Sequence, residues 1–263
     1  MAEILKKRHY QFQLDGLGIG ISNYELLEVE ETIELKSVEE LPLLRMRVKE
    51  ALQNEIKLDG YYQAVGVYNW PTLPCVLDEL SYFQKYLDDT LTFQNITPSW
   101  LLEQSVKGNL KNNRIIHFAV HGIAIPAIPE LSSLVLLADA SGNRYVNTDA
   151  IASLDMEADL VVLSACETGL GEIIPSIGNI GLTQSFLLAG SKSVLVSLWE
   201  IDDYLTATFI RCFYTELSST SWNYPLALAN TKRKCLLGEL GEELKNPLYW
   251  AAFIWFGTFT GPQ

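Results

Sequence analysis

A cysteine and a histidine, each directly following a mostly apolar segment, are the side chains in this sequence best suited to covalent chemistry. Cys166 follows residues 160–165, and His121 follows residues 115–120. A thiolate is a reactive nucleophile, and a nearby imidazole can take the thiol proton and later protonate a leaving amine. Taken alone, Cys166 could instead be a core residue, because free cysteines are among the most buried residues.

The two segments preceding these residues are short, apolar and typical of strands buried on both faces of a mostly parallel sheet. The carboxyl ends of neighbouring parallel strands meet at one edge, where open α/β folds bind ligands. We therefore expect His121 near Cys166, with the backbone N–H groups of Gly122 and Cys166 forming an oxyanion hole. The histidine precedes the cysteine by 45 residues (166 − 121), close to the spacing of about 50 in caspases. Together these features favour a catalytic nucleophile over a core cysteine.

A second histidine, His117, lies four residues before His121. On a helix this spacing could hold one zinc ion. The segment is better explained as a strand, in which the two imidazoles would lie about 13 Å apart. We expect no metal site, a structural role for His117, and no loop with calcium-ligand spacing.

Alternating strand and helix patterns from Tyr61 onward predict a parallel sheet covered by helices on both faces. Apolar side chains at helical offsets predict a helix over 76–87, and Thr97 with Pro98 predicts the start of another. A turn-rich sequence at 139–143 predicts a hairpin. The expected strands cover residues 62–68, 90–94, 114–120, 160–165, 193–199 and 249–259, and further helices begin near 148, 180, 202 and 226.

Residues 1–58 differ in composition from the rest of the chain. Residues 10–22 alternate around Gly16, Gly18 and Gly20, which predicts a hairpin rather than a dinucleotide-binding loop. Residues 43–56 have helical spacing. We divide the chain into residues 1–58, either an N-terminal appendage or the first elements of the domain, and a domain over residues 59–263.

Composition narrows the class of protein. The 263 residues are 48% hydrophobic and carry a net charge of −13, which argues against nucleic acid or an anionic membrane as a direct partner. The first residues contain no secretory signal, and the longest apolar run is too short to span a bilayer. The four cysteines form no CxxC pair, which favours reduced thiols in a cytoplasmic protein.

Four motifs in order resemble the CHAT-domain proteins, caspase- and separase-like relatives among the cysteine peptidases. They are HFAVHG (117–122), LSACETGLGE (163–172), SFLLAGSKSVLVSLWEIDD (185–203) and NPLYWAAFIWFG (246–257). The resemblance implies a caspase-like α/β sandwich, a His121/Cys166 dyad and endopeptidase activity, and this chemistry requires no cofactor.

The resemblance also bears on substrate preference, because separases hold arginine with an acidic residue. Asp202 and Asp203 follow SLWEI, in the region similar to the one that supplies this residue. An aspartate in the specificity pocket would form a charge-assisted pair with a basic residue before the scissile bond. The alternative is a helix N-cap at Asp202. We expect a basic preference, with Asp203 the better candidate for substrate binding.

No Lys or Arg lies between Cys166 and Gly190, so a basic-specific enzyme could not cut itself there, and we expect an intact chain. The resemblance implies one or a few protein substrates and a role in bacterial defence or cell death. It implies a gasdermin-like protein as a candidate substrate and an activating protein partner. Two alternatives stay open, a catalytically silent binding or scaffold module and a cysteine hydrolase of small esters or amides.

Overall fold

The computed structural model describes residues 16–24, 38–54, 56–65, 70–87, 90–111, 113–125, 127–164 and 177–258. Its main sheet has six strands in the order β2-β1-β3-β7-β8-β9. The first five run parallel and β9 is antiparallel to β8. The strands are β1 (Gly16–Gly20), β2 (Leu91–Gln94), β3 (Ile115–Ala119), β7 (Leu160–Leu163), β8 (Ser193–Ser197) and β9 (Phe253–Gly257). The prediction of an α/β fold with a mostly parallel sheet is confirmed.

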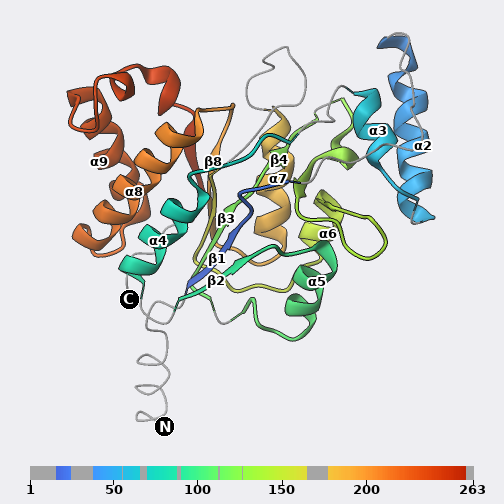
Figure 1. Ribbon diagram of the computed structural model, residues 1–263, viewed down its shortest axis with the longest axis horizontal. Coiled ribbons are helices and arrows are strands. Elements are labelled where there is room, and N and C mark those ends of the chain that lie inside the picture. The colour runs from blue at the N-terminus through green and yellow to red at the C-terminus, as the bar shows by residue number, and fades with distance from the viewer. Residues whose placement is uncertain are drawn as a thin grey trace.

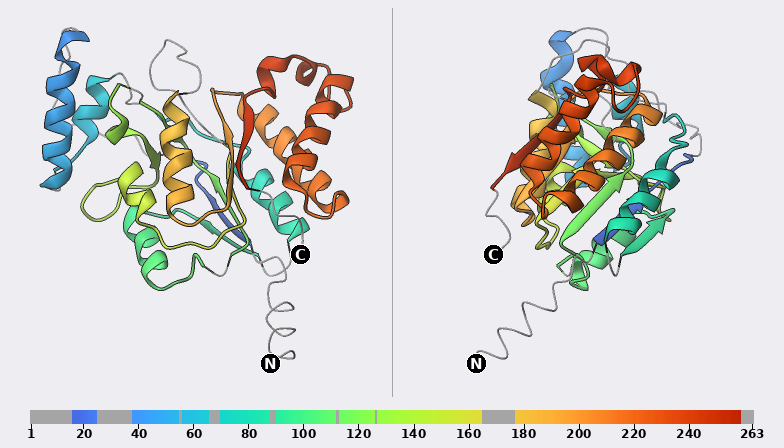
Figure 2. Two further views of the ribbon diagram at one scale, coloured as in Figure 1. Left: turned by 180° about the vertical axis from the view of Figure 1, so that it is seen from behind. Right: turned by 90° about the vertical axis from the view of Figure 1, so that its left-hand side faces the viewer.

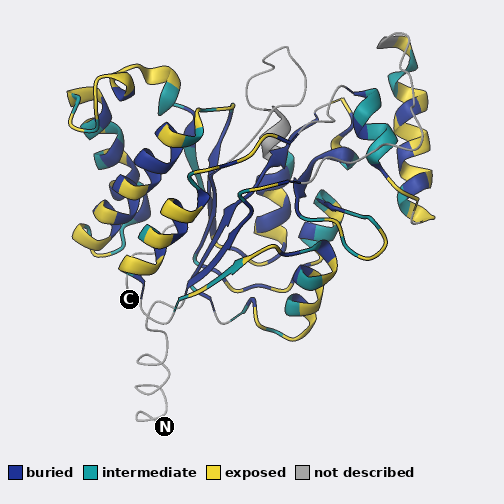
Figure 3. Cartoon of the chain, viewed as in Figure 1, coloured by how far each residue is buried: buried dark blue, intermediate teal, exposed yellow. Residues whose placement is uncertain are grey.

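Helices cover both faces of this sheet (Figures 1 and 2). One face carries α4 (Val76–Tyr86), α8 (Asp203–Ser219) and α9 (Tyr224–Leu237), and the other carries α5 (Pro98–Val106), α6 (Thr148–Ala152) and α7 (Ile177–Leu188). Alternate residues of the central strands enter two hydrophobic clusters, with Val162 packed toward α8 and Val161 toward α7. The strands are therefore buried on both faces, while the outer faces of the helices are exposed (Figure 3).

A smaller antiparallel sheet, β4-β5-β6, extends from the end of β3. Its strands are β4 (Gly122–Ile123), β5 (Ser133–Val135) and β6 (Tyr145–Asn147). Helices α2 (Leu41–Gln53) and α3 (Asp59–Ala64) contribute buried residues to the same hydrophobic cluster as α7. The short 3-10 helices are η1 (Val38–Glu40), η2 (Pro129–Leu131), η3 (Glu243–Lys245) and η4 (Pro247–Tyr249).

Strand β1 corrects the prediction of a hairpin over residues 10–22. The described part of that segment forms a single strand, paired in parallel with both β2 and β3. Its glycines allow α4 to pack directly on the strand. A Cβ atom added to Gly20 would lie 2.4 Å from Cγ1 of Val76, and one added to Gly18 would lie 2.9 Å from Cδ2 of Leu80.

Two further expectations change. The strand predicted over 62–68 is wrong at its start, because residues 59–64 form α3, with the backbone N–H of Tyr62 donating to the carbonyl of Leu58. The last strand begins only at Phe253. The helices expected at 76–87 and after Thr97 are confirmed, and the Thr97 hydroxyl caps α5 by accepting from the Trp100 N–H.

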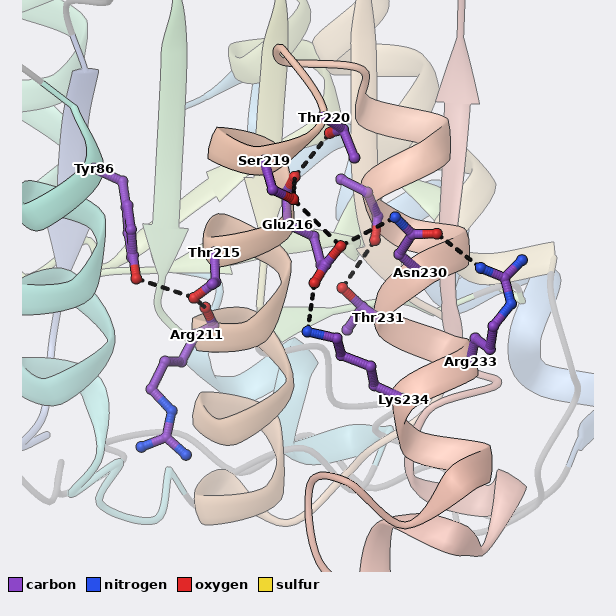
Figure 4. A network of polar contacts seen from close by, with 11 residues as sticks. Tyr86, Arg211, Thr215, Glu216, Ser219, Thr220, Asn230, Thr231, Arg233 and Lys234 are labelled. Carbon is purple, nitrogen blue, oxygen red and sulfur yellow. Dashed lines mark hydrogen bonds and ion pairs between the residues drawn. The ribbon is translucent and has the colours of Figure 1, made fainter.

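A polar network joins α8 to α9 (Figure 4). The buried carboxylate of Glu216 accepts hydrogen bonds from Lys234 at 2.6 Å and from the side-chain amide of Asn230 at 3.0 Å. These bonds oppose the effect of burial and lower the pKa of Glu216 below its ordinary value. The network fixes the pair of helices that covers one face of the sheet.

Candidate active site

His121 lies directly beyond β3 and is held from two sides. Its backbone N–H donates to the hydroxyl of Tyr24 at 3.1 Å, and its side-chain Nε2 lies 2.7 Å from the carbonyl oxygen of Pro71. The rings of Tyr24 and Trp70 pack around the imidazole, with centroids 4.7 and 5.7 Å away. The side chain is 1% exposed, so its orientation is fixed by packing as well as by hydrogen bonds.

The contact with Pro71 determines which imidazole nitrogen carries the hydrogen. A carbonyl oxygen can only accept, so Nε2 of His121 must be the donor. In the neutral ring the lone pair then lies on Nδ1, which becomes the basic atom. The Pro71 carbonyl thus acts as an orienting group for the imidazole.

The ends of β3 and β7 meet at one edge, as the sequence predicted for neighbouring parallel strands. Phe118 pairs with Leu163, and the backbone N–H of Ser164 donates to the Phe118 carbonyl at 3.3 Å. Cys166 lies outside the described residues, two positions beyond Ser164. Gly122 opens β4 and pairs with Leu134.

A pocket of about 210 Å³ lies beside His121. It joins the strand ends to the starts of α4 and α8, and its walls are formed by Pro71, Thr72, Leu73, Val76, Glu79, Ala119, His121, Ser164, Glu200, Ile201, Asp202, Asp203 and Thr206. Four of these side chains are carboxylates, and no Lys or Arg appears among the described residues of the lining. The pocket therefore suits a cationic group.

The two predicted substrate-binding aspartates both reach this pocket but have different contacts. Asp202 is exposed and caps α8, because its Oδ1 accepts from the backbone N–H groups of Tyr204 and Leu205 at 3.0 and 3.1 Å. Asp203 is half-buried, and its Oδ2 accepts from the Cys75 N–H at 2.7 Å. Burial raises the pKa of Asp203, although this hydrogen bond opposes the shift. The N-cap expected at Asp202 is present, and Asp203 is the aspartate not engaged in capping.

A buried polar cluster beneath the pocket includes His117. Its Nδ1 contacts the Tyr214 hydroxyl at 3.1 Å, and its Nε2 lies 3.2 Å from both the Ser164 hydroxyl and Glu79 Oε1. His117 is completely buried and fits the structural role expected of it. The sequence analysis did not identify Glu79. The signal that could have found it is a charged residue on the same apolar face of α4 as Val76 and Leu80.

The three cysteines within the described ranges have unreactive surroundings. Burial, reinforced by the carboxylate of Asp203, raises the pKa of the Cys75 thiol to about 11. Burial also raises the pKa of Cys212, and it raises that of Cys235 to about 12. All three thiols are therefore protonated near neutral pH and are poor nucleophiles.

Two further features are absent from the described ranges. No group of three or more His, Cys, Asp or Glu side chains is placed there to hold a metal ion. No helix in the same ranges combines the length and apolar character needed to cross a membrane.

Comparison with known proteins gives one family and several distant relatives. Residues 22–258 match the CHAT domain family. Tetratricopeptide repeat protein 28 of Homo sapiens is 28% identical over 151 residues, which cover 55% of this chain and 5% of the human protein. The Mus musculus protein of the same name is 29% identical over 114 residues, 41% of this chain and 4% of the mouse protein. This chain therefore corresponds to a small part of those relatives.

Among solved structures, the crystal structure of the Saccharomyces cerevisiae separase–securin complex aligns with a TM-score of 0.43 and 15% identity. The alignment covers 97% of this chain and 13% of the yeast chain.

Proposed function

This chain belongs to the CHAT domain family, and we propose that it is a cysteine endopeptidase whose catalytic dyad is His121 and Cys166. The observation that carries the proposal is the orientation of His121, whose Nε2 bonds to the Pro71 carbonyl at the edge of a pocket that Ser164 also lines. Cys166 follows Ser164 by two residues, and two residues of chain span at most about 7 Å. The proposal requires the Cys166 thiol to come within hydrogen-bonding distance of the imidazole.

The chemistry follows from this pairing. Nδ1 of His121 takes the Cys166 proton, and the thiolate sulfur attacks the carbonyl carbon of the scissile peptide bond. The N–H groups of Gly122 and Cys166 receive the developing oxyanion. The tetrahedral intermediate collapses, the C–N bond breaks, and the imidazolium protonates the leaving amine. Water, deprotonated by His121, then hydrolyses the thioester and restores the thiol.

The raised pKa values of the other cysteines support Cys166 as the nucleophile. Burial is the largest cause of the shift at Cys75, Cys212 and Cys235, and it disfavours the thiolate at each.

The acidic pocket supports cleavage after a basic residue. Asp203 lines the pocket, and a carboxylate forms strong charge-assisted hydrogen bonds with an arginine or lysine side chain. As part of the proposal, the enzyme acts in the cytoplasm on one or a few protein substrates, with a gasdermin-like protein as a candidate. A partner protein that activates it is also proposed, on the basis of the family resemblance.

Cleavage-site profiling tests the proposal. The parent chain, Cys166→Ala, His121→Ala and the matched control Cys212→Ala are each incubated with a diverse peptide library, and new termini are identified by mass spectrometry. The parent and the control should cut mainly after arginine or lysine, and the two dyad variants should lose more than about 10³-fold in rate. Cuts by Cys166→Ala at the parent rate would refute the dyad. No cuts by the parent, alone or with cell extract, would favour a binding module.

The specificity claim has its own test. Asp203→Ala should lower the ratio of cleavage after arginine to cleavage after leucine. An unchanged ratio would remove Asp203 from the specificity pocket.

A further inference from the structure

The pocket beside His121 contains a buried carboxylate that the proposed dyad chemistry does not use. Glu79 lies on α4, lines the pocket and is 2% exposed. Carboxylates are almost never fully buried unless they are paired, because removing the charge from water is costly. The buried carboxylate of Glu79 therefore requires hydrogen-bond donors or a cation beside it.

The neighbouring His117 supplies little to this carboxylate. Nε2 of His117 lies 3.2 Å from the Ser164 hydroxyl, which also contacts the Phe118 carbonyl at 3.5 Å. Glu79 Oε1 lies at the same distance from Nε2, but among the described residues it accepts no hydrogen bond. One N–H cannot serve both oxygens well.

The other ring nitrogen of His117, Nδ1, contacts the Tyr214 hydroxyl rather than Glu79. Burial, and then the charge of Glu79, raise the pKa of the Tyr214 hydroxyl well above its ordinary value, so it remains a donor. Its oxygen lies 3.1 Å from Nδ1 of His117. Neither ring nitrogen of His117 therefore makes a hydrogen bond to Oε1 of Glu79.

The other carboxylates of the pocket already have hydrogen-bond donors or are exposed to water. Asp202 accepts two backbone N–H groups of α8, and Asp203 accepts the N–H of Cys75. Glu200 is exposed to water. Glu79 is the one carboxylate among the described lining residues that is both buried and short of donors.

We infer that Glu79 is a specificity-determining residue that accepts hydrogen bonds from the guanidinium of a substrate arginine. The inference deepens the proposed function and rests on it for the peptide nature of the ligand. A guanidinium carries five N–H donors in a planar fork, so it can serve buried Glu79 and half-buried Asp203 together. The compact ammonium of lysine has three donors at one atom, and Glu79 therefore favours arginine over lysine.

Binding to a chain that cannot cleave tests this inference. Cys166→Ala is titrated calorimetrically with Nα-acetyl-arginine methylamide and with the citrulline analogue, which is nearly isosteric but uncharged. The arginine compound should bind at least about tenfold more tightly than the citrulline compound. If the two compounds bind with equal affinity, the inference is overturned before any Glu79 variant is made.

Variants of α4 then locate the effect. Adding Glu79→Gln should lower arginine affinity at least about tenfold and leave citrulline affinity within about threefold. The matched control Asp78→Asn removes the same charge from the adjacent, exposed position of the helix and should change neither. Thermal unfolding of each variant shows that it is folded, and Glu79→Asp, which keeps the charge, should retain part of the arginine preference. Loss of both affinities together in a folded Glu79→Gln variant would indicate a structural role and overturn the inference.

The design separates this inference from the proposed function. If the parent chain cleaved no peptide but bound arginine in a Glu79-dependent way, the result would count against the proposed function and would leave this inference intact. If the parent chain cleaves after arginine and Glu79→Gln leaves the ratio of cleavage after arginine to cleavage after leucine unchanged, this inference alone is overturned.

Discussion

Removing one hydroxyl group, that of Tyr24, should weaken both the fold and the positioning of His121. The hydroxyl accepts the His121 N–H at 3.1 Å and donates to the Val135 carbonyl at 3.2 Å, so it joins the end of β3 to β5. Tyr24→Phe keeps the ring that packs on the imidazole and removes these two hydrogen bonds.

The magnitude follows from the polar groups that lose this partner. Both bonds are buried, and a buried group deprived of its hydrogen-bond partner costs about 1–3 kcal/mol. We therefore expect Tyr24→Phe to lower the free energy of unfolding by about 1–3 kcal/mol. Because the N–H that positions His121 is one of these groups, the imidazole should also shift, with a loss of about tenfold to a hundredfold in kcat/KM.

Tyr62→Phe is the matched control. Its hydroxyl donates to the Leu131 carbonyl and contacts the Ser133 hydroxyl, and its ring stacks on Tyr145, so its loss should cost similar stability. Urea denaturation measures both stabilities, and hydrolysis of an arginyl peptide well below the melting temperature measures activity. Equal losses of activity in Tyr24→Phe and Tyr62→Phe, or an unaltered urea midpoint for Tyr24→Phe, would refute the reasoning.

Three further predictions concern stability and use urea denaturation. Gly20→Ala places a Cβ 2.4 Å from a methyl group of α4 and should lower the free energy of unfolding by about 1–3 kcal/mol. The control Gly181→Ala, in helix α7, meets its nearest atom at 3.8 Å and should raise the free energy of unfolding by up to about 1 kcal/mol. Equal urea midpoints for the two variants would contradict this prediction. Asp202→Ala removes the cap of α8 and should cost about 1 kcal/mol, with Asp202→Asn largely neutral. Because the folded-state pKa of Glu216 is lowered, its contribution is present above the ordinary value of 4.5 and is lost as pH falls through the folded pKa. Glu216→Gln should therefore be less stable than the parent at pH 7, and the difference should shrink toward pH 3; a constant difference would contradict the assignment.

The parts of the fold that were predictable depend on local patterns with one physical explanation. The apolar segments before His121 and Cys166 form the neighbouring strands β3 and β7, because strands buried on both faces must be apolar throughout. Thr97 was identified as a helix cap because a hydroxyl there can satisfy a backbone N–H of the first turn.

The errors come from residues whose role is set by distant parts of the chain. The glycines of β1 suggested a turn, since turns are rich in glycine. In the fold, the absence of their side chains makes room for α4, a helix that begins far along the sequence at Val76. A glycine-rich strand and a glycine-rich turn look alike until the packing partner is known.

The candidate site was predictable only through its side chains. His121 and Asp203 were identified from their types and positions, and both line the same pocket. The group that orients His121 is the backbone carbonyl of Pro71, and every residue has such a carbonyl, so composition cannot distinguish it. Glu79 was detectable as a charge on an apolar helix face, but its relation to His121 required the structure.

The position of β1 in the sheet has a consequence for folding during synthesis. This strand is the first of the described strands to be made, yet it lies between β2 and β3, both made later. A pair of strands alone is marginally stable, so before β3 leaves the ribosome any lasting structure of β1 and β2 depends on α4, the helix packed on β1. We expect the sheet to be completed slowly, because its essential strand pairs join residues far apart in sequence. Until that point β1 exposes unpaired edges, and other chains on the same polysome offer it competing partners.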